Sequence, residues 1–265
     1  MCYFTDAKGK FHLLDGDRQA TLAAEYLAYL LDKSGLASKL NIGVVQTAYA
    51  NGASTEYITT VLKLETRTTA TGVKHLHHAA QRFDIGVYFE ANGHGTVLFS
   101  QRTLKILEKH EPQSPAQLDA LEGLRAMSNL INQTVGDAIS DLLMVEVILA
   151  HKKWGPAEWH ATYNDLPNRL VRVDVKDRNL FKTTEDERKL VYPLRIQKDI
   201  DSTTAKFNKG RAFARASGTE DAVRVYAEAA STSEADTLAE KIANLVKFYS
   251  DDPYKNAPSH GNPYA

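Results

Sequence analysis

The sequence predicts an α/β fold: a domain with a mixed, mainly parallel sheet built from βαβ units, followed by a small α+β domain at the C-terminal end. Three observations predict it. Over residues 41–100, short apolar strands alternate with helices of about ten residues, which is the pattern of βαβ units. Residues 101–153 carry apolar side chains at helical spacing almost throughout. After the Gly155–Pro156 step, strand patterns lead to one closing helix over 233–249.

The composition is typical of a globular chain and argues against several classes of function. Of 265 residues, 43% are apolar and 25% are charged, and the net charge of -1 gives no basic field for nucleic acid or anionic lipid. The single cysteine, Cys2, leaves no internal disulfide framework and is typical of a reducing compartment. No apolar run approaches the roughly 20 residues that span a bilayer, and no signal-peptide pattern opens the chain. We expect a cytoplasmic protein without nucleic-acid or membrane partners.

A hairpin and a helix are predicted for residues 1–36. Apolar alternation on both sides of a turn at 6–9 predicts the hairpin, and a lone hairpin is marginal in water, so we expect further sheet to belong with it. The helix over 18–34 has an acid at its start, Asp15 or Asp17, and Gly35 past its end, which are the usual caps. One helix face carries five apolar side chains: Leu22, Tyr26, Leu27, Leu30 and Leu31.

The middle of the chain, 37–154, is predicted to hold the α/β domain. Strands are expected over 41–47, from 66, over 84–91 and over 96–100, and helices over 55–65, 73–83, 116–133 and 137–154. In the last part, 155–250, strands are expected over 170–177, 210–216 and 221–229. A helical stretch over 184–207 is expected to be interrupted at Pro193, and Ser233 is expected to cap the closing helix. The tail, 251–265, is predicted to be flexible.

The stretch "RASGTEDAVRVYAEA" (215–229) sets two arginines beside a bend rich in hydroxyls: Arg215, Ser217, Gly218, Thr219 and Arg224. Arginine presents a rigid fork of donors that matches phosphate or carboxylate, and a glycine lets successive N–H groups converge on an anion. Strand alternation turns Arg224 away from its two valine neighbours and can return it to the bend that holds Arg215. The stretch predicts either a phosphate-binding cradle or a plain hairpin whose arginines pair with Glu220 and Asp221.

A second polar loop lies in "GVYFEANGHGTVLFS" (86–100). The Glu90 carboxylate can accept two hydrogen bonds from adjacent sugar hydroxyls, Asn92 can donate and accept, and His94 can reach a hydroxyl or a phosphate. Gly93 and Gly95 allow close approach between two strands. Asn-Gly between apolar runs is also the strongest short hairpin signal, so a tight hairpin is the alternative, and a hairpin can present a ligand.

A third segment, "GVKHLHH" (72–78), places Lys74 and His75 at a helix start, where anions are favoured. His75 and His78 could bind zinc, but no carboxylate or cysteine ligand accompanies them. Asp15-Gly16-Asp17 predicts a helix cap rather than a metal loop. His77 is expected to be a surface or packing residue.

Together these motifs resemble the α-D-phosphohexomutases. Asn92, where most branches have serine, and the segments 41–52 and 71–79 resemble the phosphoacetylglucosamine mutase family within them. The resemblance runs from Phe11 to about Tyr249. It assigns sugar binding to Lys74, His75, Glu90, Asn92, Gly93 and His94, and phosphate binding to Arg215, Ser217, Gly218, Thr219 and Arg224. It also assigns 1–36 to the end of domain 2, 37–154 to domain 3 and 155–250 to domain 4.

The resemblance implies an isomerase that interconverts N-acetylglucosamine 6-phosphate and 1-phosphate through a bisphosphate, on the route to UDP-N-acetylglucosamine. In the family, a phosphoserine in Ser-His-Asn-Pro donates the phosphoryl group and three aspartates hold Mg²⁺. This sequence has only "SHGNP" at 259–263 and "DGDR" at 15–18, so we assign no catalytic or metal residue. We expect a substrate-binding fragment that is inactive alone; the alternative is a non-catalytic sugar-phosphate binding module.

Overall fold

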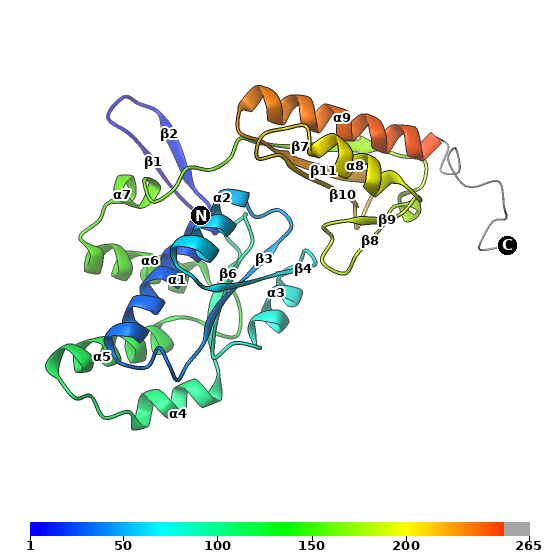
Figure 1. Ribbon diagram of the computed structural model, residues 1–265. Helices are drawn as coiled ribbons and strands as arrows, with labels where there is room; N and C mark the ends of the chain where they lie inside the picture. Colours follow the sequence, from blue (N-terminus) through cyan, green and yellow to red (C-terminus); the bar gives the residue numbers. More distant parts are fainter. Residues whose placement is uncertain (252–265) are drawn as a thin grey trace. The chain divides into compact units, whose positions relative to one another are not determined.

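The computed structural model describes residues 1–251, and the chain divides into two compact units, Met1–Asp165 and the part from Leu166 onward (Figure 1). Both units mix helices and strands, and the predicted α/β fold class is confirmed. The domain boundaries expected from the resemblance stay a prediction. The Ser-His-Gly-Asn-Pro segment and, apart from Asp251, the predicted flexible tail lie outside the described residues.

The first unit opens with the predicted hairpin, in which β1 (Cys2–Thr5) pairs antiparallel with β2 (Phe11–Leu14). Helix α1 (Gly16–Lys33) follows at once. The Asp15 carboxylate accepts a hydrogen bond from the Arg18 N–H at 3.2 Å, so the predicted helix cap is confirmed. Gly35 comes just past the helix with φ of +74°, a conformation that glycine adopts without strain.

Four strands form the sheet of the first unit, in the order β4-β3-β5-β6. β3 runs parallel to β4 and β5, and β5 and β6 form an antiparallel hairpin, so the sheet is mixed. Helical segments connect β3 to β4 and β4 to β5. The elements are β3 (Ile42–Thr47), α2 (Gly52–Glu56), the π-helical turn η1 (Tyr57–Val61), β4 (Glu65–Thr69), α3 (Val73–Ala80), β5 (Ile85–Phe89) and β6 (Gly95–Phe99).

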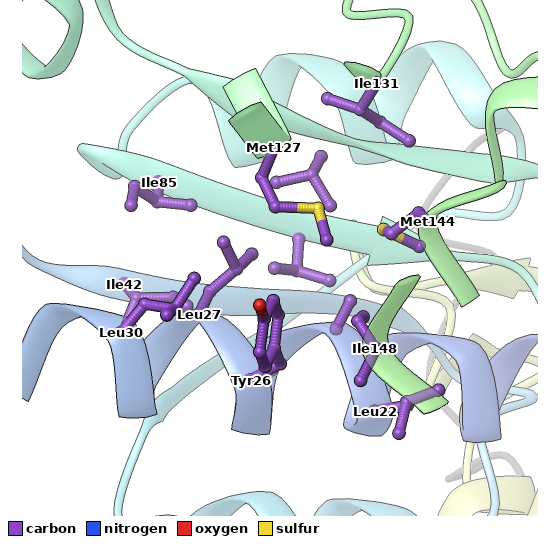
Figure 2. Packing of buried hydrophobic residues seen from close by; sticks show 14 of the residues in the cluster. Leu22, Tyr26, Leu27, Leu30, Ile42, Ile85, Met127, Ile131, Met144 and Ile148 are labelled. Atoms are coloured by element: carbon purple, nitrogen blue, oxygen red, sulfur yellow. The ribbon is translucent and has the colours of Figure 1, made fainter. Parts of the chain in front are cut away.

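Helix α1 lies at the centre of the first unit, packed between the sheet and two later helices (Figure 2). Its predicted apolar face is buried against Ile42 and Ile85 of the sheet, Met127 of α5 and Ile148 of α6. Helix α3 covers the opposite face of the sheet through Leu76 and Ala80. Strands β3 and β5 are therefore buried on both faces of the sheet, as is typical of strands that pair in parallel. The remaining helices are α4 (Gln101–Lys109), α5 (Pro115–Leu130), α6 (Ala138–Lys152) and α7 (Pro156–His160).

Arg18 joins α1 to the segment that ends the first unit. Its side chain is only 1% exposed, and it donates to the backbone oxygens of His160 at 2.8 Å and Tyr163 at 3.0 Å. A third contact, at 3.1 Å, reaches the Asp165 carboxylate. A buried guanidinium is tolerated because these acceptors replace the water it has lost.

The second unit is a three-stranded antiparallel sheet in the order β10-β11-β7, with α9 packed on one face. Apolar side chains that alternate along β11, Val223, Val225 and Ala227, face that helix and form the core with it. The elements are β7 (Asn168–Asp174), the 3₁₀ turn η2 (Arg178–Leu180), β8 (Lys182–Thr183), β9 (Leu190–Tyr192), α8 (Ile196–Thr204), β10 (Arg211–Ala216), β11 (Ala222–Glu228) and α9 (Thr232–Asp251).

Two local predictions for this unit were wrong. The expected helical stretch over 184–207 is helical only in α8; its first part is the turn and strand of the small β8–β9 hairpin. The turn forms because Asp186 accepts from the Thr184 hydroxyl and the Arg188 N–H, and such local bonds compete with a helix. The cap of α9 is Ser231, not Ser233, since the Ser231 hydroxyl oxygen accepts from the Glu234 N–H at 3.3 Å.

Candidate functional site

The polar loop of the first unit is the turn between β5 and β6, so the predicted tight hairpin is confirmed. The Gly93 N–H donates to the Glu90 oxygen at 2.7 Å, and the Glu90 N–H donates to the His94 oxygen at 2.9 Å. Gly93 has φ of +84°, and the Asn92 side-chain oxygen accepts from the His94 N–H at 2.8 Å. These bonds hold the loop rigid and leave Asn92 and His94 exposed.

A hydrogen bond ties this loop to the first turn of α3. The Glu90 carboxylate accepts from the Gly72 N–H at 3.1 Å, directly before the segment that carries Lys74 and His75. Lys74 and His94 both line a cavity of ≈ 570 Å³, which lies within the range of about 300–1,000 Å³ that is typical of pockets for small ligands. The structure therefore brings together, within one unit, the two segments that the sequence predicted to bind sugar.

His77 lines the same cavity and contacts the strand beneath it. Its Nδ1 lies 2.9 Å from the Tyr88 hydroxyl. Burial, with a smaller contribution from Asp141, raises the pKa of Tyr88 to about 12, so the hydroxyl is protonated at neutral pH. His77 is half-buried, as a packing residue is.

The Asp15-Gly16-Asp17 segment positions two loops. A Cβ on Gly16 would lie 1.7 Å from the Glu90 carbonyl oxygen, so only glycine lets the β5–β6 loop pack this closely on α1. The Gly16 N–H donates to the Ala91 oxygen at 3.2 Å. The buried Asp17 carboxylate accepts from the Asn51 N–H at 2.7 Å and so holds the loop that opens α2. Across residues 1–251, no three His, Cys, Asp or Glu side chains are placed to hold a metal ion.

In the second unit, the two arginines of the predicted cradle face each other across a strand pair. Arg215 of β10 and Arg224 of β11 are directly opposed in the register, so both side chains stand on one face of the sheet. That face is opposite to the one that packs on α9, because Val223 and Val225 alternate with Arg224. The register also sets Arg172 of β7 directly opposite Arg224, so three arginines form a row across the sheet.

Each arginine of this row contacts a carboxylate. The Arg215 Nε lies 3.4 Å from a Glu187 oxygen, and Arg224 contacts one oxygen of Glu220. The other Glu220 oxygen lies 3.1 Å from Arg172. Within the described chain, Arg172 and Glu187 are the members of this group that sequence reasoning missed. The alternation in "LVRVDV" predicts that Arg172 lies on the face away from the core. Which residue of the neighbouring strand lies opposite Arg172 depends on the strand register, which the alternation does not give.

The bend between β10 and β11 is closed by its own hydrogen bonds. The Ser217 N–H donates to the Ala222 oxygen at 2.8 Å, and the Ser217 hydroxyl oxygen accepts from the Thr219 N–H at 3.4 Å. A Cβ on Gly218 would meet no atom within 4 Å, and its φ is not in the left-handed region. The glycine therefore leaves the backbone of the bend open to approach, rather than relieving strain.

Comparison with protein-family models gives two matches. Residues 15–154 match "Phosphoacetylglucosamine mutase AMG1, domain III", and residues 170–245 match "Phosphoglucomutase/phosphomannomutase, C-terminal domain". The chain is 52% identical over 250 residues to phosphoacetylglucosamine mutase of Candida albicans, a match that covers 93% of this chain and 46% of the relative. The chain thus spans about half the length of the relatives it matches.

Two solved structures of the Aspergillus fumigatus enzyme, N-acetylphosphoglucosamine mutase, are also similar. One holds GlcNAc-6P and magnesium; it is 64% identical, with a TM-score of 0.92, over 94% of this chain and 46% of that chain. The other, a substituted form with glucose 1,6-bisphosphate, is 64% identical with a TM-score of 0.89 over the same shares. Among the described residues, no helix is long and apolar enough to cross a membrane.

Proposed function

Since the chain belongs to the phosphoacetylglucosamine mutase family, we propose that it forms the substrate-binding part of an enzyme that interconverts N-acetylglucosamine 6-phosphate and 1-phosphate. The enzyme is an isomerase of the phosphotransferase type. The A. fumigatus complexes with GlcNAc-6P and with glucose 1,6-bisphosphate support a sugar phosphate as substrate and a bisphosphate as intermediate. The product serves the synthesis of UDP-N-acetylglucosamine, in the cytoplasm.

The observation that carries the proposal is the direct opposition of Arg215 and Arg224 beside an open bend. Two guanidinium forks on one face can grip a phosphate dianion with charge-assisted hydrogen bonds. The Gly218 backbone leaves room for an oxygen to approach, and the hydroxyls of Ser217 and Thr219 stand in the same bend. We assign these five residues to the phosphate that is not reacting.

The sugar is assigned to the β5–β6 hairpin and the start of α3. Glu90 accepts hydrogen bonds from adjacent hydroxyls, Asn92 donates and accepts at the exposed tip, and Gly93 keeps the loop backbone close to the ligand. Lys74 and His94 line the cavity described above, and His75 is exposed one position along α3. All are proposed contacts, supported by the resemblance and by this proximity.

The residues of this chain bind and orient the substrate rather than transfer phosphate. The magnesium in the A. fumigatus complex supports Mg²⁺ as the cofactor of the full-length enzyme, where it would neutralise charge on the transferring group. The described residues offer no cluster that fits the ion. We therefore place its ligands, and the phosphoserine, in the part of the relatives that this chain does not cover.

The proposal is tested by titrating the chain with N-acetylglucosamine 6-phosphate in a calorimeter. Arg224→Ala removes a charge-assisted contact worth about 1.5–3 kcal/mol, so we expect affinity to fall by about tenfold or more. The matched control is Arg169→Ala on β7, because that arginine pairs with Asp236 of α9 on the other face of the sheet. Equal affinity of Arg224→Ala and the parent chain would refute the assignment.

A further inference from the structure

Glu220 is shared between two arginines of the row. One of its carboxylate oxygens accepts from the Arg224 Nη2, and the other lies 3.1 Å from the Arg172 Nη2. The Arg172 Nη2 also lies 3.0 Å from the Asp174 carboxylate on its own strand. The three side chains of the shared group are partly exposed, 34% for Glu220, 41% for Arg224 and 51% for Arg172, so a small ion in solution can reach them.

A phosphate that binds Arg224 therefore meets a carboxylate already in place. The row balances three guanidinium groups, Arg172, Arg215 and Arg224, against three carboxylates, Glu187, Glu220 and Asp174. A dianion added beside Arg224 is repelled by Glu220 unless that carboxylate moves or is neutralised by another cation. Arg172 is placed to neutralise it.

We propose that Glu220 is an exchangeable counter-ion of the phosphate cradle: it rests on Arg224 in the free protein, and Arg172 holds it alone when a phosphate binds Arg224. Arg172 is thus a positioning residue that acts through Glu220. The inference rests on the proposed phosphate binding at Arg224 and deepens it, because it names the group that tunes the affinity of that site.

The geometry allows this exchange without moving the backbone. The Glu220 carbonyl oxygen accepts from the Ala222 N–H at 2.8 Å, and the Ser217 N–H closes the bend on the Ala222 oxygen, so the chain on both sides of Glu220 is held. One carboxylate oxygen already lies on Arg172, so release of Arg224 needs only rotation of the Glu220 side chain. Register pairing of β7 with β11 keeps Arg172 opposite Arg224 throughout.

The test is a double-mutant cycle on the whole chain, with inorganic phosphate and N-acetylglucosamine 6-phosphate as probes in a calorimeter. Arg172→Gln leaves Glu220 uncompensated, and we expect about three- to fivefold weaker binding, the scale of an exposed ion pair. Glu220→Gln removes the competitor and should strengthen binding by a similar factor. In the Glu220→Gln background, Arg172→Gln should change affinity less than about twofold. Arg172→Lys, which keeps the charge, should bind like the parent.

Two results would overturn the inference. An equal loss from Arg172→Gln in both backgrounds would mean that Arg172 acts on the phosphate without Glu220. Weaker binding by Glu220→Gln, with an unchanged amide NMR spectrum of the β10–β11 hairpin, would mean that Glu220 supports the ligand rather than competing with it. Arg224→Ala in the same titration separates the two proposals. If Arg224→Ala does not weaken binding, the proposed phosphate site is refuted. If the effects of Arg172→Gln and Glu220→Gln are additive, only the proposed exchange of Glu220 is refuted.

Discussion

Replacing Gly16 by alanine should destabilise the first unit, because this glycine is the contact point between α1 and the β5–β6 loop. The added Cβ would lie 1.7 Å from the Glu90 carbonyl oxygen and 2.8 Å from its carbonyl carbon. Both are backbone atoms of a loop held by its own hydrogen bonds, so no flexible side chain can give way. The loop must move away from α1, and the bond from the Gly16 N–H to Ala91 is lost.

The expected cost follows from three contributions. Overpacking costs about 1–3 kcal/mol, and the lost hydrogen bond costs about 1 kcal/mol. The better helix propensity of alanine offsets about 1 kcal/mol of this. The free energy of unfolding should therefore fall by about 1–3 kcal/mol, which for a unit of this size lowers the Tm by roughly 3–10 °C.

Tryptophan fluorescence reports this unit alone, because the two tryptophans of the chain, Trp154 and Trp159, both lie within Met1–Asp165. Urea and thermal unfolding of Gly16→Ala should be compared with Gly123→Ala, a second helix glycine whose Cβ would have the flexible Leu30 side chain as its nearest neighbour, at 3.1 Å. Unfolding of Gly16→Ala at the same temperature and urea concentration as the parent would refute the reasoning.

Two further predictions use the same fluorescence measurement. Burial, and to a smaller extent Asp137, raise the pKa of Asp141 to about 7. The folded state then binds more protons than the unfolded state between about pH 4 and pH 7, so stability falls as pH rises through this window, by up to about 4 kcal/mol. Asp141→Asn should remove that slope, and an unchanged difference between pH 5 and pH 8 would contradict it. Arg18→Met leaves the carbonyl oxygens of His160 and Tyr163 without the donor that Arg18 supplies, and should lower the free energy of unfolding by about 2–4 kcal/mol. An unchanged urea midpoint would count against this.

Features with a local cause were predictable from the sequence. Period-two alternation, an Asn-Gly turn and an acid ahead of an apolar helix face predicted the β5–β6 hairpin, the strands of both units other than β8 and β9, and the Asp15 cap. The turn before β9 was mistaken for helix because charged residues at 184–189 form helices readily, and only the hydrogen bonds of Thr184 and Asp186 favour the turn.

The sequence by itself determined which residue types each loop presents, because motif and periodicity are properties of neighbouring residues. Only the tertiary structure decided which of them meet. The register of β7, β10 and β11 sets Arg172, Arg224 and Arg215 in one row, and the packing of α1 against the β5–β6 loop requires glycine at position 16. Both depend on contacts between segments far apart in the chain, and pairing partners and register are selected by burial of the whole core.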